Sequence, residues 1–152
     1  MSLANLKLDS SKFVELTTFY MGDLLFGIDI SHVVEINRIL DVTFVPQAPE
    51  YVLGVMNLRG KIVTVIDLGH KNGLGSTEIS KKTRNLIVSS QNEPIGLLVD
   101  RVADVVFADA EKLLPPPSNV QGIHRKYLKG VYQTEKGLIA VLDVEEVLKD
   151  EE

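Results

Sequence analysis

The chain has 152 residues and a formal net charge of −5 at pH 7, with 45% hydrophobic and 24% charged residues. These proportions are ordinary for a globular protein, and the acidic balance argues against nucleic-acid binding, which usually requires a basic face. The sequence contains no cysteine, which excludes disulfides, thiolate metal sites and thiol nucleophiles. Because we find neither a signal peptide nor an apolar run of membrane-spanning length, we expect a cytoplasmic protein without direct membrane insertion.

The first third of the chain predicts a hairpin followed by a helix. Residues 1–12 are polar and mixed, and we expect them to form a flexible N-terminus. Phe13 to Met21 and Leu24 to Ile30 are typical of two strands joined by a turn at Gly22-Asp23. Ser31 suits a helix N-cap, and the apolar residues after it have helical spacing, so a short amphipathic helix is predicted there. Those apolar residues are Val33, Val34, Ile36 and Ile39.

The stretch from Tyr51 to Leu68, YVLGVMNLRGKIVTVIDL, predicts a second hairpin with its turn at Arg59-Gly60. Both arms are almost continuously apolar, so we expect other parts of the chain to cover both faces. Gly60 can take the positive φ angle that a tight turn requires. A charged arginine therefore stands at the tip of an otherwise buried hairpin. The Gly- and Ser-containing residues 69–83 that follow are predicted to form a loop.

The second half shows the same order of elements. Strands are predicted over 85–90, 95–99, 127–132 and 138–144, with a short helix over 145–150. Residues 102–107 are compatible with either a helix or a strand. Pro115-Pro116-Pro117 begins a loop that runs to about residue 125.

An internal repeat relates the two halves. When the sequence is aligned with itself, five residues between 51 and 67 match five residues between 127 and 143. A different shift aligns residues 27–35 with 96–104. We therefore predict a mostly β domain over residues 13–150, made of two similar small barrels from about 13–83 and 84–150 that share an apolar seam. The first five residues are Tyr51, Gly54, Val55, Val65 and Asp67, and the five that match them are Tyr127, Gly130, Val131, Val141 and Asp143.

The sequence carries little sign of catalysis. None of the three histidines, His32, His70 and His124, has a second ligand at metal spacing nearby. Asp67 and His70 are the one pair that an enzyme hypothesis can use, and loop residues are the favoured interpretation of both. We therefore expect a binding module with no catalytic residue, no cofactor and no metal.

Four motifs together resemble the CheW family of chemotaxis coupling proteins, in that family's order, from about Phe13 to Leu148. They are GIDISHVVEINRI (27–39), VMNLRGKIVTVIDL (55–68), GLLVDRV (96–102) and GLIAVLDVEEVL (137–148). The resemblance implies two intertwined five-stranded SH3-like barrels with short helices, in one CheW-like domain. Thr64 stands where the family often has proline, and Gly69-His70 replace a common basic residue, which leaves the branch of the family open.

The resemblance also implies a function. Members of the family are non-catalytic adaptors that bind the cytoplasmic signalling tip of a chemoreceptor and the regulatory domain of the histidine kinase CheA. Through these partners they are recruited to receptor arrays at the membrane. A CheW-like scaffold of another receptor–kinase pathway, such as pilus-based motility, is the alternative.

Receptor-binding roles transfer to seven residues by this resemblance. Arg59 matches an arginine implicated in receptor coupling, and Glu35 matches an acidic helix position linked to receptor binding. Ile30, Val33 and Val102 match apolar positions that line a receptor groove between the barrels. Alternatively, these three side chains are ordinary core residues. We expect the residues that contact the kinase on the second of the two predicted barrels, about 84–150, or on its end loops. The resemblance does not identify them individually. The seven residues are Ile30, Val33, Glu35, Asn57, Arg59, Gly60 and Val102.

Overall fold

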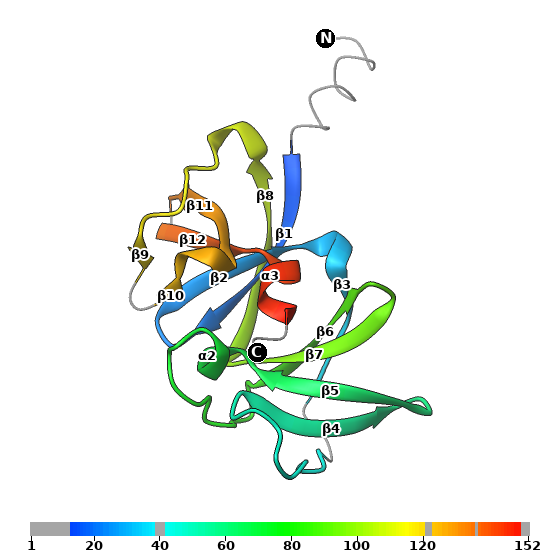
Figure 1. The fold of residues 1–152 in the computed structure, drawn as a ribbon. Helices are drawn as coiled ribbons and strands as arrows, with labels where there is room; N and C mark the ends of the chain where they lie inside the picture. Colours follow the sequence, from blue (N-terminus) through cyan, green and yellow to red (C-terminus); the bar gives the residue numbers. More distant parts are fainter. Residues whose placement is uncertain (1–12, 39–41, 121–122, 136, 150–152) are drawn as a thin grey trace, which may run out of the picture.

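Two five-stranded sheets, each curled into a small barrel, make up the fold (Figure 1). The structure is a computed structural model, and it describes residues 13–38, 42–120, 123–135 and 137–149, so the expected flexible segment 1–12 lies outside it. Barrel 1 has the strand order β11-β12-β2-β1-β8, and barrel 2 has the order β3-β6-β7-β5-β4. The fold class predicted from the sequence is confirmed.

The strands of barrel 1 are β1 (Phe13–Met21), β2 (Leu24–Asp29), β8 (Arg101–Asp109), β11 (Leu128–Thr134) and β12 (Gly137–Leu142). Those of barrel 2 are β3 (Val33–Arg38), β4 (Val52–Leu58), β5 (Lys61–Asp67), β6 (Arg84–Ser90) and β7 (Glu93–Val99). A separate short pair is formed by β9 (Asn119–Val120) and β10 (Ile123–His124). The short helices are η1 (Ile30–His32), α2 (Leu68–Lys71), η2 (Ala110–Lys112), η3 (Arg125–Tyr127) and α3 (Val144–Leu148).

The barrels are intertwined because each exchanges one strand with the other. β3 follows β2 in the chain but pairs with β6 in barrel 2, and β8 follows β7 but pairs with β1 in barrel 1. Barrel 2 therefore consists of strands within residues 33–99, and barrel 1 of strands from both ends of the chain. The expected division into halves at about residues 83 and 84 does not coincide with a boundary between the sheets, because it falls inside barrel 2.

Two glycines mark the same place in the two copies of the repeat. Gly54 pairs with Val65 beside a bulge in β4, and Gly130 pairs with Val141 beside a bulge in β11. A crossing segment lies against each glycine. Thr43 forms an isolated β-bridge to Val55 beside Gly54, and Leu114 forms one to Val131 beside Gly130. A Cβ atom on Gly54 would lie 2.2 Å from the Thr43 carbonyl oxygen, and one on Gly130 would lie 2.6 Å from that of Leu114. Only glycine lets the backbones approach so closely.

Two aspartates end the repeated hairpins in the same way. The backbone N–H of Asp67 donates to the Tyr51 carbonyl at 2.7 Å, and that of Asp143 donates to the Tyr127 carbonyl at 2.8 Å. Each aspartate then caps the short helix after its strand, α2 or α3, by accepting a hydrogen bond from a backbone N–H three residues on. The loop predicted for residues 69–83 therefore begins with a helical turn.

One apolar cluster joins the barrels, and each barrel has a smaller core of its own. α3 lies at the junction in Figure 1, and its Val144 and Val147 belong to the shared cluster. Burying side chains from both barrels in one seam explains how two such small units are stable together. The shared cluster includes Phe19, Phe26, Ile28, Ile66, Leu68, Leu86, Val88, Leu97, Val99 and Leu142.

The helix predicted from Ser31 onward is wrong. Asp29, not Ser31, caps the single turn η1, and the chain then continues as the strand β3. A bulge between Val33 and Glu35 inserts an extra residue, so Val33 and Ile36 both lie opposite residues of the shared cluster, Val88 and Leu86. The three-residue spacing of Val33 and Ile36 is close to the period of an α-helix, which is why the sequence pattern favoured a helix here.

Candidate functional site

The tip of the β4–β5 hairpin holds Arg59 in an unusual backbone conformation. Arg59 and Gly60 have φ angles of 49° and 87°, which is the pattern of a two-residue type I′ turn. The side-chain oxygen of Asn57 accepts a hydrogen bond of 2.8 Å from the Gly60 backbone N–H and so closes this turn. Because positive φ is uncommon for a residue such as arginine, its presence here favours a role for the side chain.

Arg59 forms an ion pair with Glu35 across the end of barrel 2. Its guanidinium donates to both carboxylate oxygens, with Nη2 bonded to Oε1 and Nη1 lying 3.4 Å from Oε2. Glu35 is on β3, one edge strand of the sheet, and Arg59 follows β4, the other edge strand. The pair therefore bridges the two edges and fixes the direction of the guanidinium. Hydrogen bonding and charge attraction from Glu35 raise the pKa of Arg59 above its ordinary value.

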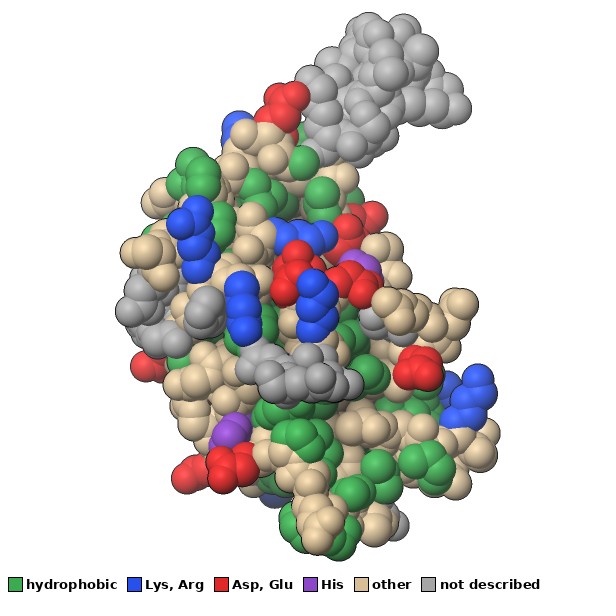
Figure 2. Space-filling view, viewed as in Figure 1, with side chains coloured by type: hydrophobic (Ala, Val, Ile, Leu, Met, Phe, Trp, Pro, Cys, Tyr) green, Lys and Arg blue, Asp and Glu red, His purple; other side chains and the backbone are tan. Residues whose placement is uncertain are grey.

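The Arg59 guanidinium stays accessible despite this pairing. Its side chain is 71% exposed, whereas that of Glu35 is 26% exposed. Basic side chains stand at the outer end of the β4–β5 hairpin in Figure 2. Hydrophobic side chains gather over β4 and β5, while acidic and basic side chains intermingle over α3 and β11.

Two of the three apolar residues expected in a groove, Val33 and Val102, lie at the shared cluster and not at the hairpin tip. Val33 and Val102 are partly buried and pack against that cluster, and Ile30 on η1 is 37% exposed. Val102 lies opposite Phe19 on β1, and Val33 opposite Val88 on β6. The expected site residues thus divide into a polar set at the end of barrel 2 and an apolar set at the seam.

The sequence did not reveal how many other apolar side chains are exposed. Val105 and Phe107 of β8 are 49% and 64% exposed, and Phe13 of β1 is 46% exposed. A bulge between Val102 and Val105 hides them from pattern analysis, because it breaks the alternation of β8. Exposed apolar side chains indicate a protein-binding surface where they lie together, and Val105 and Phe107 are two positions apart on one strand. Val34, Ile36, Phe44 and Ile62 are further examples on or beside barrel 2.

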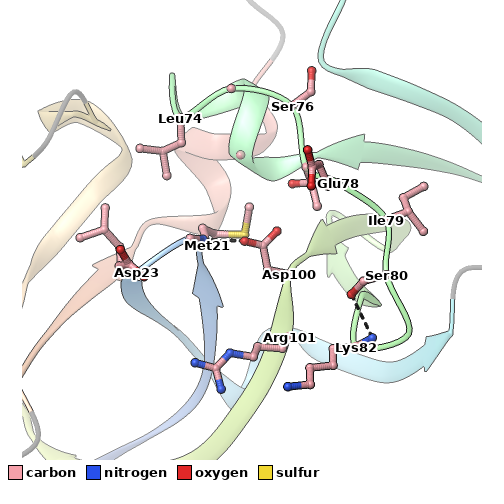
Figure 3. A pocket seen from close by; sticks show the side chains of 15 residues that line it. Met21, Asp23, Leu74, Ser76, Glu78, Ile79, Ser80, Lys82, Asp100 and Arg101 are labelled. Carbon is pink, nitrogen blue, oxygen red and sulfur yellow. Dashed lines mark hydrogen bonds between the residues drawn. The ribbon is translucent and has the colours of Figure 1, made fainter.

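A cavity of about 950 Å³ lies between the β1–β2 turn, the loop after α2 and the start of β8 (Figure 3). Figure 3 shows side chains of both charges around it, among them Asp23, Glu78, Lys82 and Arg101. Asp100 accepts a hydrogen bond of 2.5 Å from the Gly22 backbone N–H and so ties the β1–β2 turn to the end of β7. None of the seven expected site residues lines this cavity.

Asp67 and His70 do not form the pair that an enzyme hypothesis requires. The buried Asp67 carboxylate accepts hydrogen bonds from the His70 backbone N–H at 3.2 Å and from the Thr77 backbone N–H and hydroxyl, both at 2.9 Å. The His70 ring instead points toward Glu50, with Nε2 at 3.5 Å from a carboxylate oxygen. Asp67 is thus occupied in holding α2 and the loop after it.

Among the residues that the structure describes, no group of three or more His, Cys, Asp or Glu side chains is placed to hold a metal ion. No helix in the described part of the chain has the length and apolarity needed to cross a membrane.

The chain is thus a mostly β protein of two interlocked barrels, with exposed apolar side chains and an exposed cation at a hairpin tip. The family model for the CheW-like domain matches residues 15–152. The chain is 32% identical to chemotaxis protein CheW of Treponema pallidum, over 91% of this chain and 84% of that protein. It is 31% identical to chemotaxis protein CheW of Helicobacter pylori, over 93% and 85%.

A solved structure agrees with these sequence relatives. The crystal structure of scaffolding protein TtCheW from Thermoanaerobacter tengcongensis matches with a TM-score of 0.83 and 32% identity, over 90% of this chain and 88% of that one. The chain belongs to the CheW family.

Proposed function

We propose that this protein is a non-catalytic chemotaxis adaptor, which couples the cytoplasmic signalling tips of chemoreceptors to the histidine kinase CheA. The observation that carries the proposal is the match to the CheW-like domain over residues 15–152, together with relatives named as chemotaxis proteins. The protein would be recruited to receptor arrays at the membrane through its partners.

The receptor contact is proposed to use the seven residues named from the sequence. Ile30 offers exposed apolar surface on the helical turn that leads to Val33, and Val33 and Val102 are partly buried against the shared cluster. Such a surface suits the apolar face of an amphipathic helix, which is one of the recurring ways in which proteins bind helical segments. Asn57 and Gly60 set the turn that presents Arg59, and Glu35 orients its guanidinium toward carboxylates or helix-end carbonyls of the receptor.

The kinase contact is proposed on a different surface, on the part of the fold formed by the second half of the chain, about residues 84–150, or on its end loops. Separate surfaces would allow one chain to hold both partners at once, which an adaptor needs. The regulatory domain of CheA is expected to pack against this surface barrel end to barrel end.

A single substitution tests the receptor site. We expect Arg59→Ala to lower the affinity for a receptor signalling-tip fragment by at least about tenfold, because it removes an oriented charge from the rim of the site. The melting temperature should change by no more than about 2 °C, since exposed side chains seldom affect stability. Binding of the CheA regulatory domain should be retained. An unchanged receptor affinity would show that the receptor binds elsewhere, and unfolding would show that Arg59 is a structural residue.

A further inference from the structure

A cavity of about 430 Å³ opens at the end of barrel 2, beside the Arg59 tip. It lies where the tips of the β4–β5 and β6–β7 hairpins meet the bulged part of β3. Its residues come from all three places, so the folding of barrel 2 brings them together. They are Val34, Leu58, Arg59, Lys61, Ile87, Ser89, Asn92 and Pro94.

The charges that line this cavity all have one sign. Arg59 and Lys61 contribute two cations, and no aspartate or glutamate is among the lining residues. Glu35 beside it forms an ion pair with Arg59, which satisfies one of the two charges. No described carboxylate forms an ion pair with Lys61, whose side chain is exposed. A protein with a net charge of −5 thus presents a local surplus of positive charge here.

The floor and walls of the cavity are largely apolar. Ile87 is completely buried, and Val34 at the entrance is 55% exposed. Pro94 and Leu58 are partly buried. A charge held against such walls is less screened than one in open water, so an incoming anion gains more from Lys61 than from a lysine on a flat surface. The matching ligand has a carboxylate on an aliphatic stem.

We propose that this cavity receives an acidic side chain of the receptor signalling tip, whose carboxylate binds Lys61 while its methylene groups cover Val34 and Leu58. The proposal rests on the proposed function, since it places the receptor contact of Arg59 and this cavity in one interface. Lys61 then determines specificity for an acidic residue in the partner, and Arg59, already held by Glu35, supports the same charge. Ser89 and Asn92 offer hydrogen-bond donors at the rim.

Charge reversal tests this assignment. Titration of a receptor signalling-tip fragment should show a loss of about three- to tenfold in affinity for Lys61→Ala, and a larger loss for Lys61→Glu. The wild-type affinity should fall with added salt more steeply than that of Lys61→Ala, because the variant lacks one screened attraction. Lys112→Glu, an exposed charge change on η2, which follows β8 of barrel 1, is the matched control and should bind as wild type does.

A compensating change in the partner identifies the bound side chain. Each acidic residue of the receptor fragment is replaced by lysine in turn, and one such change should restore binding to Lys61→Glu. Normal binding by Lys61→Glu, while Arg59→Ala binds weakly, would overturn this inference and leave the proposed receptor site intact. Normal binding by both variants would overturn the receptor site as well. Equal losses for Lys61→Glu and Lys112→Glu would show only a general charge effect, which also overturns the inference.

Discussion

The two aspartates that end the repeated hairpins provide an internal comparison of stability. Asp67 and Asp143 occupy matching positions and cap short helices, but only Asp67 also accepts two hydrogen bonds from Thr77. Replacing Asp143 by alanine removes a cap, and replacing Asp67 removes a cap and the attachment of the following loop. We therefore expect Asp67→Ala to be the more destabilising change.

The difference can be estimated from these contacts. Loss of an N-cap costs about 1 kcal/mol, which applies to both variants. A hydrogen bond to a charged group contributes about 1.5 kcal/mol at the lower end of its range, and Asp67 makes two with Thr77. Because the released loop regains conformational freedom, part of that loss is offset. Asp67→Ala should therefore lower the free energy of unfolding by about 2 kcal/mol more than Asp143→Ala does.

Urea unfolding of the wild type and the two variants measures this difference, provided that the m-values agree. Hydrogen exchange at the Thr77 amide gives a local measurement, and it should accelerate in Asp67→Ala alone. Losses that agree within about 0.5 kcal/mol would refute the reasoning, because the Thr77 contacts would then contribute nothing measurable.

Three further predictions concern the fold and the role of His70. Gly54→Ala and Gly130→Ala should each lower the free energy of unfolding by about 1–3 kcal/mol in the same urea assay, because the added methyl group would collide with the backbone of the crossing segment. Two fragments divided within residues 72–83 should not fold when each is purified alone, because β6 then loses β3 and β1 loses β8. Circular dichroism of each fragment measures this. His70→Ala should bind the receptor fragment and the kinase domain as the wild type does, and loss of both with the fold intact would contradict our assignment of His70.

The sequence predicted the hairpins and their repeat because these depend on local signals. Turn residues such as Gly22-Asp23 and Arg59-Gly60 stand between largely apolar runs, and the structure places turns there. The repeated Asp67 and Asp143 also have equivalent roles, since both close a hairpin and cap a helix. Turns and helix caps depend on residues that are close in sequence, so they can be predicted without knowing which other strands a hairpin pairs with.

The sequence was least informative where a bulge interrupts a strand. Both β3 and β8 contain one, and in each the apolar residues that share a face are three positions apart. That spacing favoured a helix over β3 and left β8 undecided. These are also the two strands that cross between the barrels, so the pairing that stabilises them is distant in sequence and cannot be inferred from the local pattern.

The candidate site was only partly predictable for the same reason. Arg59 is conspicuous in the sequence as a charge at the tip of an apolar hairpin. Its partner Glu35 was named, but the ion pair between them follows from the closure of barrel 2, which brings the two edge strands together. The exposure of Val34 and the cavity that it shares with Lys61 likewise depend on that closure.

The central claim is that one chain holds a receptor and a kinase at the same time. Biolayer interferometry on an immobilised receptor signalling-tip fragment tests it directly, with the CheA regulatory domain added alone or with this protein. We expect the kinase domain to be retained in proportion to the amount of this protein until the receptor sites are saturated. Kinase retention that is unaffected by this protein, while each partner is shown to be folded, would contradict it.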